Sequence, residues 1–274
     1  MKQLLKADLF RVYKSMLSRI ALILALAFPV LIALMFLGFR AVAEIDSAMD
    51  GDMLFNANTI LGSVYSLSNN IGLVVPAFAG ILVCTDCTSG TLRNKVIAGN
   101  RRAAIYLSHL IVSILFSVVV ITIYAAVTAG ITLLMFPFSW DADALNLGRE
   151  IVYFVANGTM TFVFMATFTT MLAMIFRNAA PTIIFTVVFG IVLYLINTVV
   201  GLLNYESYKY AVYFIPTFAG NTFNLNNFSL LGIFGQTAPA DRGLIFTEGM
   251  LSYLFFGAVH TVIGLLAFKK RDIR

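Results

Sequence analysis

The sequence predicts an all-α integral membrane protein with six transmembrane helices. Of its 274 residues, 60% are hydrophobic and 11% are charged, and the mean hydropathy is +0.93. Soluble domains carry about 25% charged residues, so this composition excludes an ordinary soluble fold. Basic residues also crowd both ends of the chain, before the first apolar stretch and after the last. We therefore expect one transmembrane domain over residues 1–274.

Charge-free stretches of sufficient length predict the spans, because a helix needs roughly 20 apolar residues to cross a bilayer. One such stretch, 210–240, is rich in Asn, Gly and Pro, whose polar and broken backbone groups would go unsatisfied in hydrocarbon. We expect short re-entrant or interfacial helices there, within an external segment over 204–247. The six expected spans are about 20–39, 67–85, 105–136, 151–176, 181–203 and 249–268.

The charge distribution predicts the orientation in the membrane, because Lys and Arg favour the cytoplasmic side. The segment 1–19 carries five basic residues, and the tail after the last span reads KKRDIR. Both termini are therefore expected in the cytoplasm, which requires an even number of crossings. Six crossings place 14 of the 18 Lys and Arg residues inside and ten of the 13 acidic residues outside. The expected location is the cell membrane, with multiple passes.

The first 19 residues predict an amphipathic helix on the cytoplasmic face. Apolar residues recur there at helical spacing, with Lys and Arg between them. Such a helix lies in the membrane interface with its basic side chains facing anionic head groups. The alternative is a simple basic tail that only sets the topology.

Individual spans carry further local signals. Pro29 predicts a kink in the first span, and Pro76 falls inside the second. The third is too long for one perpendicular crossing, so it should tilt or begin in the cytosol. The short turn Arg177–Asn178 predicts a tight hairpin of the fourth and fifth spans, with Pro181 in the first turn of the fifth.

A polar segment, 86–104, separates the second and third spans on the cytoplasmic side. Its run SGTLRNKVIAG over 89–99 predicts a short helix that Gly99 ends as the residue after the C-cap.

The two faces of this short helix differ. Leu92 and Val96 share one face, whereas Arg93, Asn94 and Lys95 point elsewhere. A short, cationic, amphipathic helix suits a groove on a soluble partner. The alternative is anchoring to lipid head groups by the basic residues of this segment.

Several chemistries are excluded or disfavoured. A phosphate-binding loop needs a Gly-Lys pair, and none occurs, so an ATPase that drives transport must be another polypeptide. Cys84 and Cys87 would need His109 and His260 to complete a zinc site, but His260 belongs to the last span, so we interpret both cysteines as packed thiols. The span cores lack Asp, Glu, Lys and Arg, unlike those of ion-coupled carriers. Nothing pairs a base with a nucleophile or metal as in an intramembrane hydrolase.

The run SGTLRNKVIAG-x-RR-x-x-IYLSHL resembles the cytoplasmic turn between spans two and three of bacterial ABC-2-type transporter permeases. Asp86, four residues before Gly90, looks matched to the usual acid of that family's turn. The resemblance extends over the whole chain, from the amphipathic start to the basic tail. It implies two permease chains, expected as a homodimer, around a central pathway, each bound to an ATPase subunit.

The resemblance also implies roles for particular residues. The helix over 1–19 would be a connecting helix, and 86–104 would be the coupling region against the ATPase. The implied coupling residues are Asp86, Gly90, Thr91, Leu92, Arg93, Asn94, Lys95, Gly99, Arg101 and Arg102. Spans two and five would line the pathway. The candidate wall residues are Phe78, Phe185, Phe189, Tyr194 and Asn197, for each of which ordinary helix packing or lipid contact is the alternative.

The composition and the resemblance together give the expected cargo and partners. With 25 Phe and 11 Met residues, the pathway walls should be apolar and adaptable, which suits amphipathic peptides such as antimicrobial or toxin peptides. Drug or lipid export is the alternative within the family, and a passive channel or secondary carrier is the alternative outside it. The chain is expected to catalyse no reaction and to bind no cofactor, since ATP and Mg would belong to the partner ATPase. Membrane lipid is an expected partner, and nucleic acid is not.

Overall fold

The computed structural model describes residues 2–45, 57–67, 71–136, 138, 147–201 and 242–270. These residues form α-helices joined by turns, and no strand occurs among them. The all-α prediction is therefore confirmed for this part of the chain. The helices are α1 (Lys2–Lys14), α2 (Met16–Ile45), α4 (Ala57–Ser63), α5 (Val74–Thr88), α6 (Thr91–Ile97), α7 (Arg102–Met135), α8 (Leu147–Phe176), α9 (Ala179–Gly201) and α14 (Arg242–Lys270).

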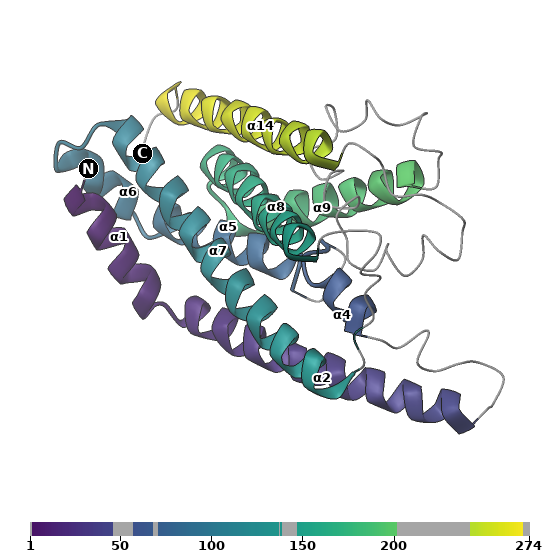
Figure 1. Cartoon of the computed structure of the whole chain (residues 1–274). Helices are drawn as coiled ribbons and strands as arrows, with labels where there is room; N and C mark the ends of the chain where they lie inside the picture. The colour runs from purple at the N-terminus through teal and green to yellow at the C-terminus, as the bar shows by residue number, and fades with distance from the viewer. Residues whose placement is uncertain are drawn as a thin grey trace.

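The long helices form a bundle (Figure 1). Five of the described helices are long and apolar enough to cross a membrane, and a sixth span results if α5 and α6, bent by 60° at their junction, are counted as one. The five are Met16–Phe39, Arg102–Met135, Gly148–Phe176, Ala179–Asn197 and Gly243–Lys270. A membrane protein with several passes follows from these lengths and compositions.

The N-terminal helix is shorter than predicted and is docked on the bundle. It ends at Lys14, and Ser15 caps the next helix by accepting a hydrogen bond on Oγ from the Ser18 N–H at 3.1 Å. Leu4, Asp8 and Val12, spaced by four, form its buried face, which packs against α7. The helix is therefore amphipathic in an unexpected way, since its buried face carries an acid.

The second span departs most from the prediction. The expected helix over 67–85 begins only at Val74, because the chain makes a turn over Ile71–Leu73. The backbone at Gly72 passes so close to Ser66 and Leu67 that any side chain at this position would collide with them. The 15 residues of α5 span about 22 Å, which is less than the roughly 30 Å of a hydrocarbon core.

The remaining spans follow the predicted pattern. Helix α7 has 34 residues and starts at Arg102, before the expected apolar run. The hairpin of α8 and α9 turns through Arg177, which has a positive φ of 56°, and Asn178 accepts a hydrogen bond from the Ala180 N–H at 3.1 Å. The re-entrant helices expected around 210–235 lie outside the described residues.

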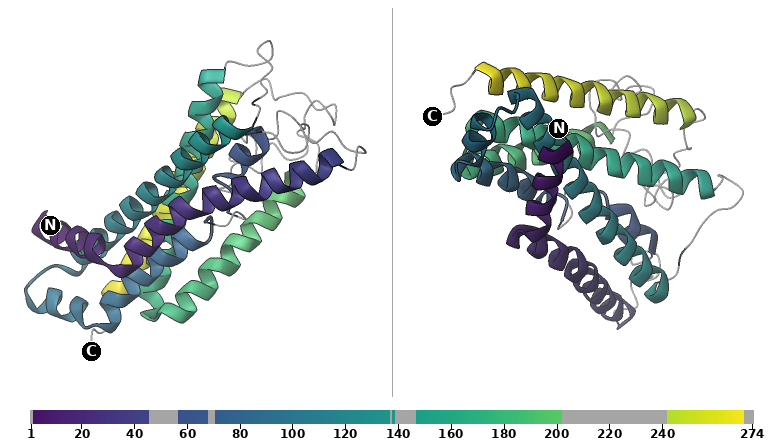
Figure 2. Two further views of the ribbon diagram at one scale, coloured as in Figure 1. Left: turned by 90° about the horizontal axis from the view of Figure 1, so that it is seen from below. Right: turned by 90° about the vertical axis from the view of Figure 1, so that its left-hand side faces the viewer.

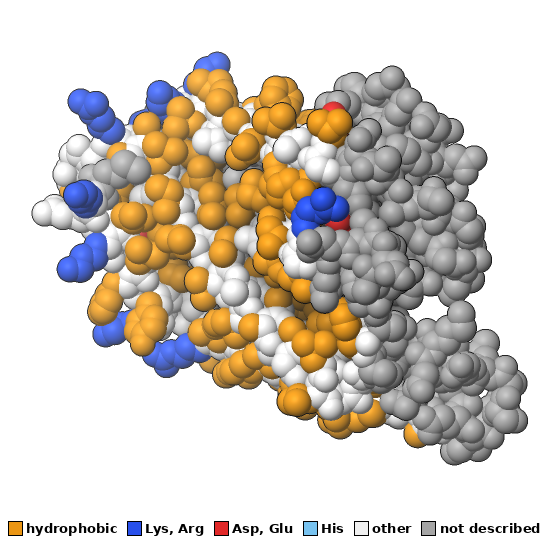
Figure 3. All heavy atoms as spheres, in the orientation of Figure 1, with side chains coloured by type: hydrophobic (Ala, Val, Ile, Leu, Met, Phe, Trp, Pro, Cys, Tyr) orange, Lys and Arg blue, Asp and Glu red, His pale blue; other side chains and the backbone are white. Residues whose placement is uncertain are grey.

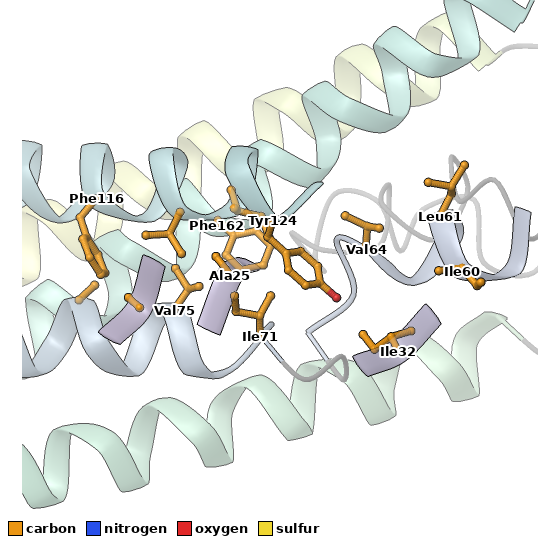
Figure 4. Packing of buried hydrophobic residues seen from close by; sticks show 14 of the residues in the cluster. Ala25, Ile32, Ile60, Leu61, Val64, Ile71, Val75, Phe116, Tyr124 and Phe162 are labelled. Atoms are coloured by element: carbon orange, nitrogen blue, oxygen red, sulfur yellow. The ribbon is translucent and has the colours of Figure 1, made fainter. Parts of the chain in front are cut away.

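The core is packed with small residues and rings. Helices in lipid gain little from apolar burial and associate by close packing. On α2, Ala21 and Ala25 are buried toward the bundle, which lets α7 approach closely. Figure 4 shows Tyr124, Phe162 and Val75, which belong to one buried cluster.

Most of the Lys and Arg side chains visible in Figure 3 lie at one end of the bundle. Figure 3 shows Lys and Arg side chains gathered at the end that carries α1 and α6, and a broad hydrophobic surface beside them. The last turn of α14 reaches the same end (Figures 1 and 2). There Arg102 Nη1 donates a 2.8 Å hydrogen bond to the Lys269 carbonyl and joins the start of α7 to the end of α14.

Candidate functional site

The short helix α6 is bounded by two glycines in the left-handed region. Gly90 precedes it with φ 72°, and Gly99 follows it with φ 81°. The Gly99 N–H donates to the Val96 carbonyl at 2.9 Å, and the Asn100 N–H donates to the Lys95 carbonyl at 3.3 Å. This pair of bonds is a Schellman motif, so the predicted position of Gly99 after the C-cap is confirmed.

The apolar face of α6 is turned into the protein. Leu92 is 4% exposed, and Val96 packs partly buried beside it. The cluster that receives them takes side chains from six helices, so it is a second core at this end of the bundle. Its buried members are Leu4, Val83, Cys84, Leu92, Ile105, Tyr106, Leu110, Ala173, Met174 and Phe268. These residues anchor α6, and they are not available to a partner.

The outward face of α6 carries a different set of residues. Arg93 and Asn94 are exposed, and Ile97 exposes 72% of its surface although it is a large apolar residue. Arg101 is exposed just after the helix. The sequence pattern does not predict a role for Ile97, because it assigns the apolar face of this helix to Leu92 and Val96. The available signal was its four-residue spacing from Arg93, which puts both on one face.

Lys95 points inward, unlike its neighbours Arg93 and Asn94. Its Nζ donates hydrogen bonds to Asp8 Oδ1 at 2.6 Å and to Asp86 Oδ2 at 3.3 Å. It also lies 3.2 Å from His109 Nε2, which is itself 3.3 Å from Asp86 Oδ2. The guanidinium of Arg11 contacts Asp86 as well. We call these five residues, Asp8, Arg11, Asp86, Lys95 and His109, the ion-pair cluster.

Four helices build the ion-pair cluster. Asp8 and Arg11 come from α1, Asp86 from the last turn of α5, Lys95 from α6, and His109 from α7. Asp8 is 2% exposed and Asp86 is 1% exposed. Their charges are balanced by two cations, which is what allows two carboxylates to be buried together.

The surroundings shift the pKa values of the α1 members. Burial alone would raise the pKa of Asp8, but the hydrogen bonds from Lys95 and from Ser108, whose Oγ lies 2.7 Å from Asp8 Oδ2, outweigh it and hold that pKa below its ordinary value. Burial lowers the pKa of Arg11, and the Asp8 carboxylate opposes this shift in part. Asp8 is therefore a carboxylate at neutral pH.

The same atoms offer the geometry of a cation site. Ligand atoms of Asp8, Asp86 and His109 lie within 4.8 Å of one another. The ammonium of Lys95 lies among them and supplies the positive charge from within the chain. We therefore assign the cation of this site to Lys95 rather than to a metal.

The predicted coupling residues thus divide into two groups. Arg93, Asn94, Gly99 and Arg101 are exposed, and Gly90, Thr91 and Arg102 are partly exposed. Asp86, Leu92 and Lys95 are engaged in the interior. Only the first group can contact a partner directly.

The five candidate wall residues are not gathered on one surface. Phe78 packs against the main core, and Asn197 is buried. Phe189 stacks on Phe168 with ring centroids 3.9 Å apart. Phe185 and Tyr194 point out of the bundle and are exposed. Their role as a pathway wall stays a prediction.

The four residues considered for zinc lie apart. Cys84 Sγ is 3.4 Å from Thr182 Oγ1, and Cys87 Sγ is 3.5 Å from the Val83 carbonyl, so both thiols pack against their own and neighbouring helices. His260 lies in α14 with its Nδ1 3.3 Å from Thr167 Oγ1 of α8. His109 belongs to the ion-pair cluster. Hydrogen bonds such as that of His260 join neighbouring helices in a membrane.

Comparison with protein families gives one match over most of the chain. A family model described as "Protein of unknown function (DUF2705)" matches residues 32–274. The matched region includes α5, α6 and α7, whereas α1, with Asp8 and Arg11, precedes it. No curated protein matches the chain significantly. The chain belongs to the DUF2705 family.

Proposed function

We propose that this chain is the transmembrane permease subunit of an ATP-driven exporter of the ABC-2 type. One observation carries the proposal. Helix α6 presents Ile97 to solvent beside Arg93, with Arg101 close behind, while its opposite face is anchored in the bundle.

A coupling element has to meet two requirements at once. It must be fixed to the spans on one side and offer a recognisable surface to a soluble partner on the other. Helix α6 meets the first through Leu92 and Lys95 and the second through Ile97 and Arg93. A partner surface that fits this face has an apolar groove for Ile97 and acidic residues at its rim for Arg93.

The partner in this proposal is a separate ATPase subunit. The sequence holds no phosphate-binding loop, so ATP and Mg bind to that subunit. Two permease chains then enclose one pathway, and each takes one ATPase.

The topology in this proposal has six crossings with both termini in the cytoplasm. In this proposal the second crossing is centred on α5, within the predicted range 67–85, and α6 follows it on the cytoplasmic side. Support comes from the shared end of α1, α6 and the last turn of α14, where Lys and Arg gather (Figure 3). Basic residues favour the cytoplasmic side of a membrane.

The proposed cargo is an amphipathic peptide. The described bundle is lined by aromatic and aliphatic side chains, and its spans carry neither Asp, Glu, Lys nor Arg in their central parts. Ion-coupled carriers use such charged groups as relays. Drug or lipid export by the same machinery is the alternative cargo class.

The test is a pull-down of the tagged full-length chain from its native membrane in mild detergent, with mass spectrometry and an ATPase assay. We expect a soluble protein with a phosphate-binding loop and ATP turnover in the eluate. Ile97→Asp and Arg93→Glu should each reduce the recovery of this protein at least tenfold. Ile97→Asp places an acid against the apolar groove of the partner, and Arg93→Glu places one against its acidic rim. Lys6→Glu, a charge reversal at an exposed position of α1, is the matched control and should retain the partner.

The contrary outcome is equally specific. A chain that purifies alone and without ATPase activity would assign it to the channel or carrier class. The basic residues of α6 would then be lipid anchors. Recovery of the same ATPase with Ile97→Asp and Arg93→Glu would show that α6 is not the docking element.

A further inference from the structure

One side chain joins three segments that are distant in the sequence. Lys95 of α6 bonds Asp8 of α1, 87 residues earlier, and Asp86 in the last turn of α5. Helix α1 leads directly into α2, and α5 lies in the second predicted span. Lys95 thus connects α6 to the helix that precedes the first span, α2, and to the end of α5.

We infer that Lys95 makes α1, α6 and the last turn of α5 move as one mechanical unit, so that any displacement of α6 is passed to α1. Asp8 and Asp86 are almost completely buried, so Lys95 and Arg11 rather than water compensate their charges. A movement of α6 alone would leave two buried carboxylates facing a single cation, Arg11. Moving α1 and α5 together with α6 avoids this penalty.

Helix α7 contacts the ion-pair cluster through a hydroxyl and an imidazole. Ser108 donates to Asp8 Oδ2, and His109 lies beside Asp86 and Lys95. The Ser108 hydroxyl donates to a carboxylate, so this bond is also charge-assisted. Helix α1 packs on α7 through its buried face, and Leu92 of α6 shares the second core with residues of α7. Helix α7 therefore supports the cluster from one side, whereas Lys95 supplies the direct bond between α6 and α1.

The arrangement gives α6 two functions on opposite faces. Its outer face, with Arg93 and Ile97, is exposed to a partner. On its inner face Lys95 forms ion pairs with α1 and α5. With only seven residues, α6 is about two turns long and has little length over which to bend. The link to an ATPase rests on the proposed function, whereas the mechanical connection does not.

The connection can be measured as a distance distribution in the full-length chain. Tyr13 of α1 and Asn94 of α6 are both exposed and are replaced by Cys for spin labels, after Cys84→Ala and Cys87→Ala. Double electron–electron resonance in lipid nanodiscs should give one narrow distance. Lys95→Met should broaden it at least twofold. Arg93→Met, the same loss of charge on the outer face of the same helix, should leave it unchanged.

A milder variant isolates the bond to α1. Asp8→Asn keeps the shape of the side chain and leaves Lys95 paired with Asp86. It should broaden the distance between Tyr13 and Asn94, whereas labels at Thr85 and Asn94, which report on α5 and α6, should keep their narrow distance. This variant decides the matter where Lys95→Met does not fold.

Two results would overturn the inference. One is a distance distribution in Lys95→Met that is as narrow as in Arg93→Met. The other is an unchanged distribution between the labels at Tyr13 and Asn94 in Asp8→Asn. Both measurements use the chain without any partner. Failure to recover an ATPase would therefore leave this inference standing, and a recovered ATPase would not rescue it.

Discussion

At the scale of single residues, Lys95 shows how the fold can use a charge that looks available to a partner. In the sequence it stands within the basic run Arg93-Asn94-Lys95. Three residues after Leu92 and next to Val96, it lies on the edge of the buried face of α6. Its side chain is 11% exposed and reaches Asp8 and Asp86. Its main contribution is therefore to stability and helix placement.

Replacing Lys95 by Met should lower the free energy of unfolding by about 3–5 kcal/mol, because removal of one member of a buried pair leaves an uncompensated charge. Arg93→Met should change it by less than about 0.5 kcal/mol, as expected for an exposed position. Thermal or denaturant unfolding of both variants in one detergent measures the difference.

The double variant Lys95→Met with Asp8→Asn provides the control for charge balance. It leaves Asp86 paired with Arg11 and removes the second carboxylate, so part of the lost stability should return. If the double variant were less stable than Lys95→Met alone, the unpaired charge of Asp8 could not be the cause of the loss.

The sequence predicted part of this site. The helical spacing of Leu92, Val96 and Gly99 placed a short helix and its end correctly. The spacing could not say which face is buried, because an apolar pair suits a partner groove as well as a core. The partner of Lys95, Asp8, lies in another helix, and such long-range pairing leaves no mark in the local pattern.

At the scale of elements, the ends of α6 depend on backbone conformation. Gly99 has φ 81°, and no atom lies within 4 Å of the position that a Cβ would take. Gly99→Ala should therefore cost about 1–2 kcal/mol from the left-handed conformation alone. We expect lower stability and weaker recovery of the ATPase, because the last turn of α6 carries Ile97.

Gly130→Ala provides the matched control for Gly99→Ala. Gly130 lies within α7, and its Cβ position is equally open. In a helix interior, Ala is favoured over Gly by up to about 1 kcal/mol. This variant should be neutral or slightly stabilising in the same unfolding and pull-down assays. An equal loss of stability in both variants would refute the role of the positive φ.

The prediction of elements succeeded where length and composition decide and failed where a tertiary contact decides. Long charge-free runs gave α7, α8, α9 and α14, because lipid requires such runs to be helical. The stretch before α5 holds Ser68, Asn69, Asn70 and Gly72, which favour turns, but its lack of charge placed it in the predicted span. The close approach of the Gly72 backbone to Ser66 and Leu67 is a tertiary contact and could not be read from the sequence.

At the scale of the whole molecule, the two ends of the bundle differ in kind. The end with α6 holds the second core, the ion-pair cluster and the Arg102 bond to α14. Six helices contribute to the second core, so this end is held by apolar packing as well as by ion pairs. A compact basic end suits the cytoplasmic side, where a soluble partner and anionic lipid are present.

This polarity predicts which positions face which side of the membrane. In a variant with Cys84→Ala and Cys87→Ala, single cysteines at Asn94 and at Gly148 occupy exposed positions on α6 and at the start of α8. The end of α8 lies next to the last turn of α5, with Ala173 beside Cys87, so its start lies at the opposite end of the bundle. A membrane-impermeant maleimide added to intact cells should label Gly148→Cys and should label Asn94→Cys only after permeabilisation. The reverse pattern would place α6 outside the cell, beyond the reach of an ATPase, and would rule out the exporter proposal together with its cytoplasmic termini.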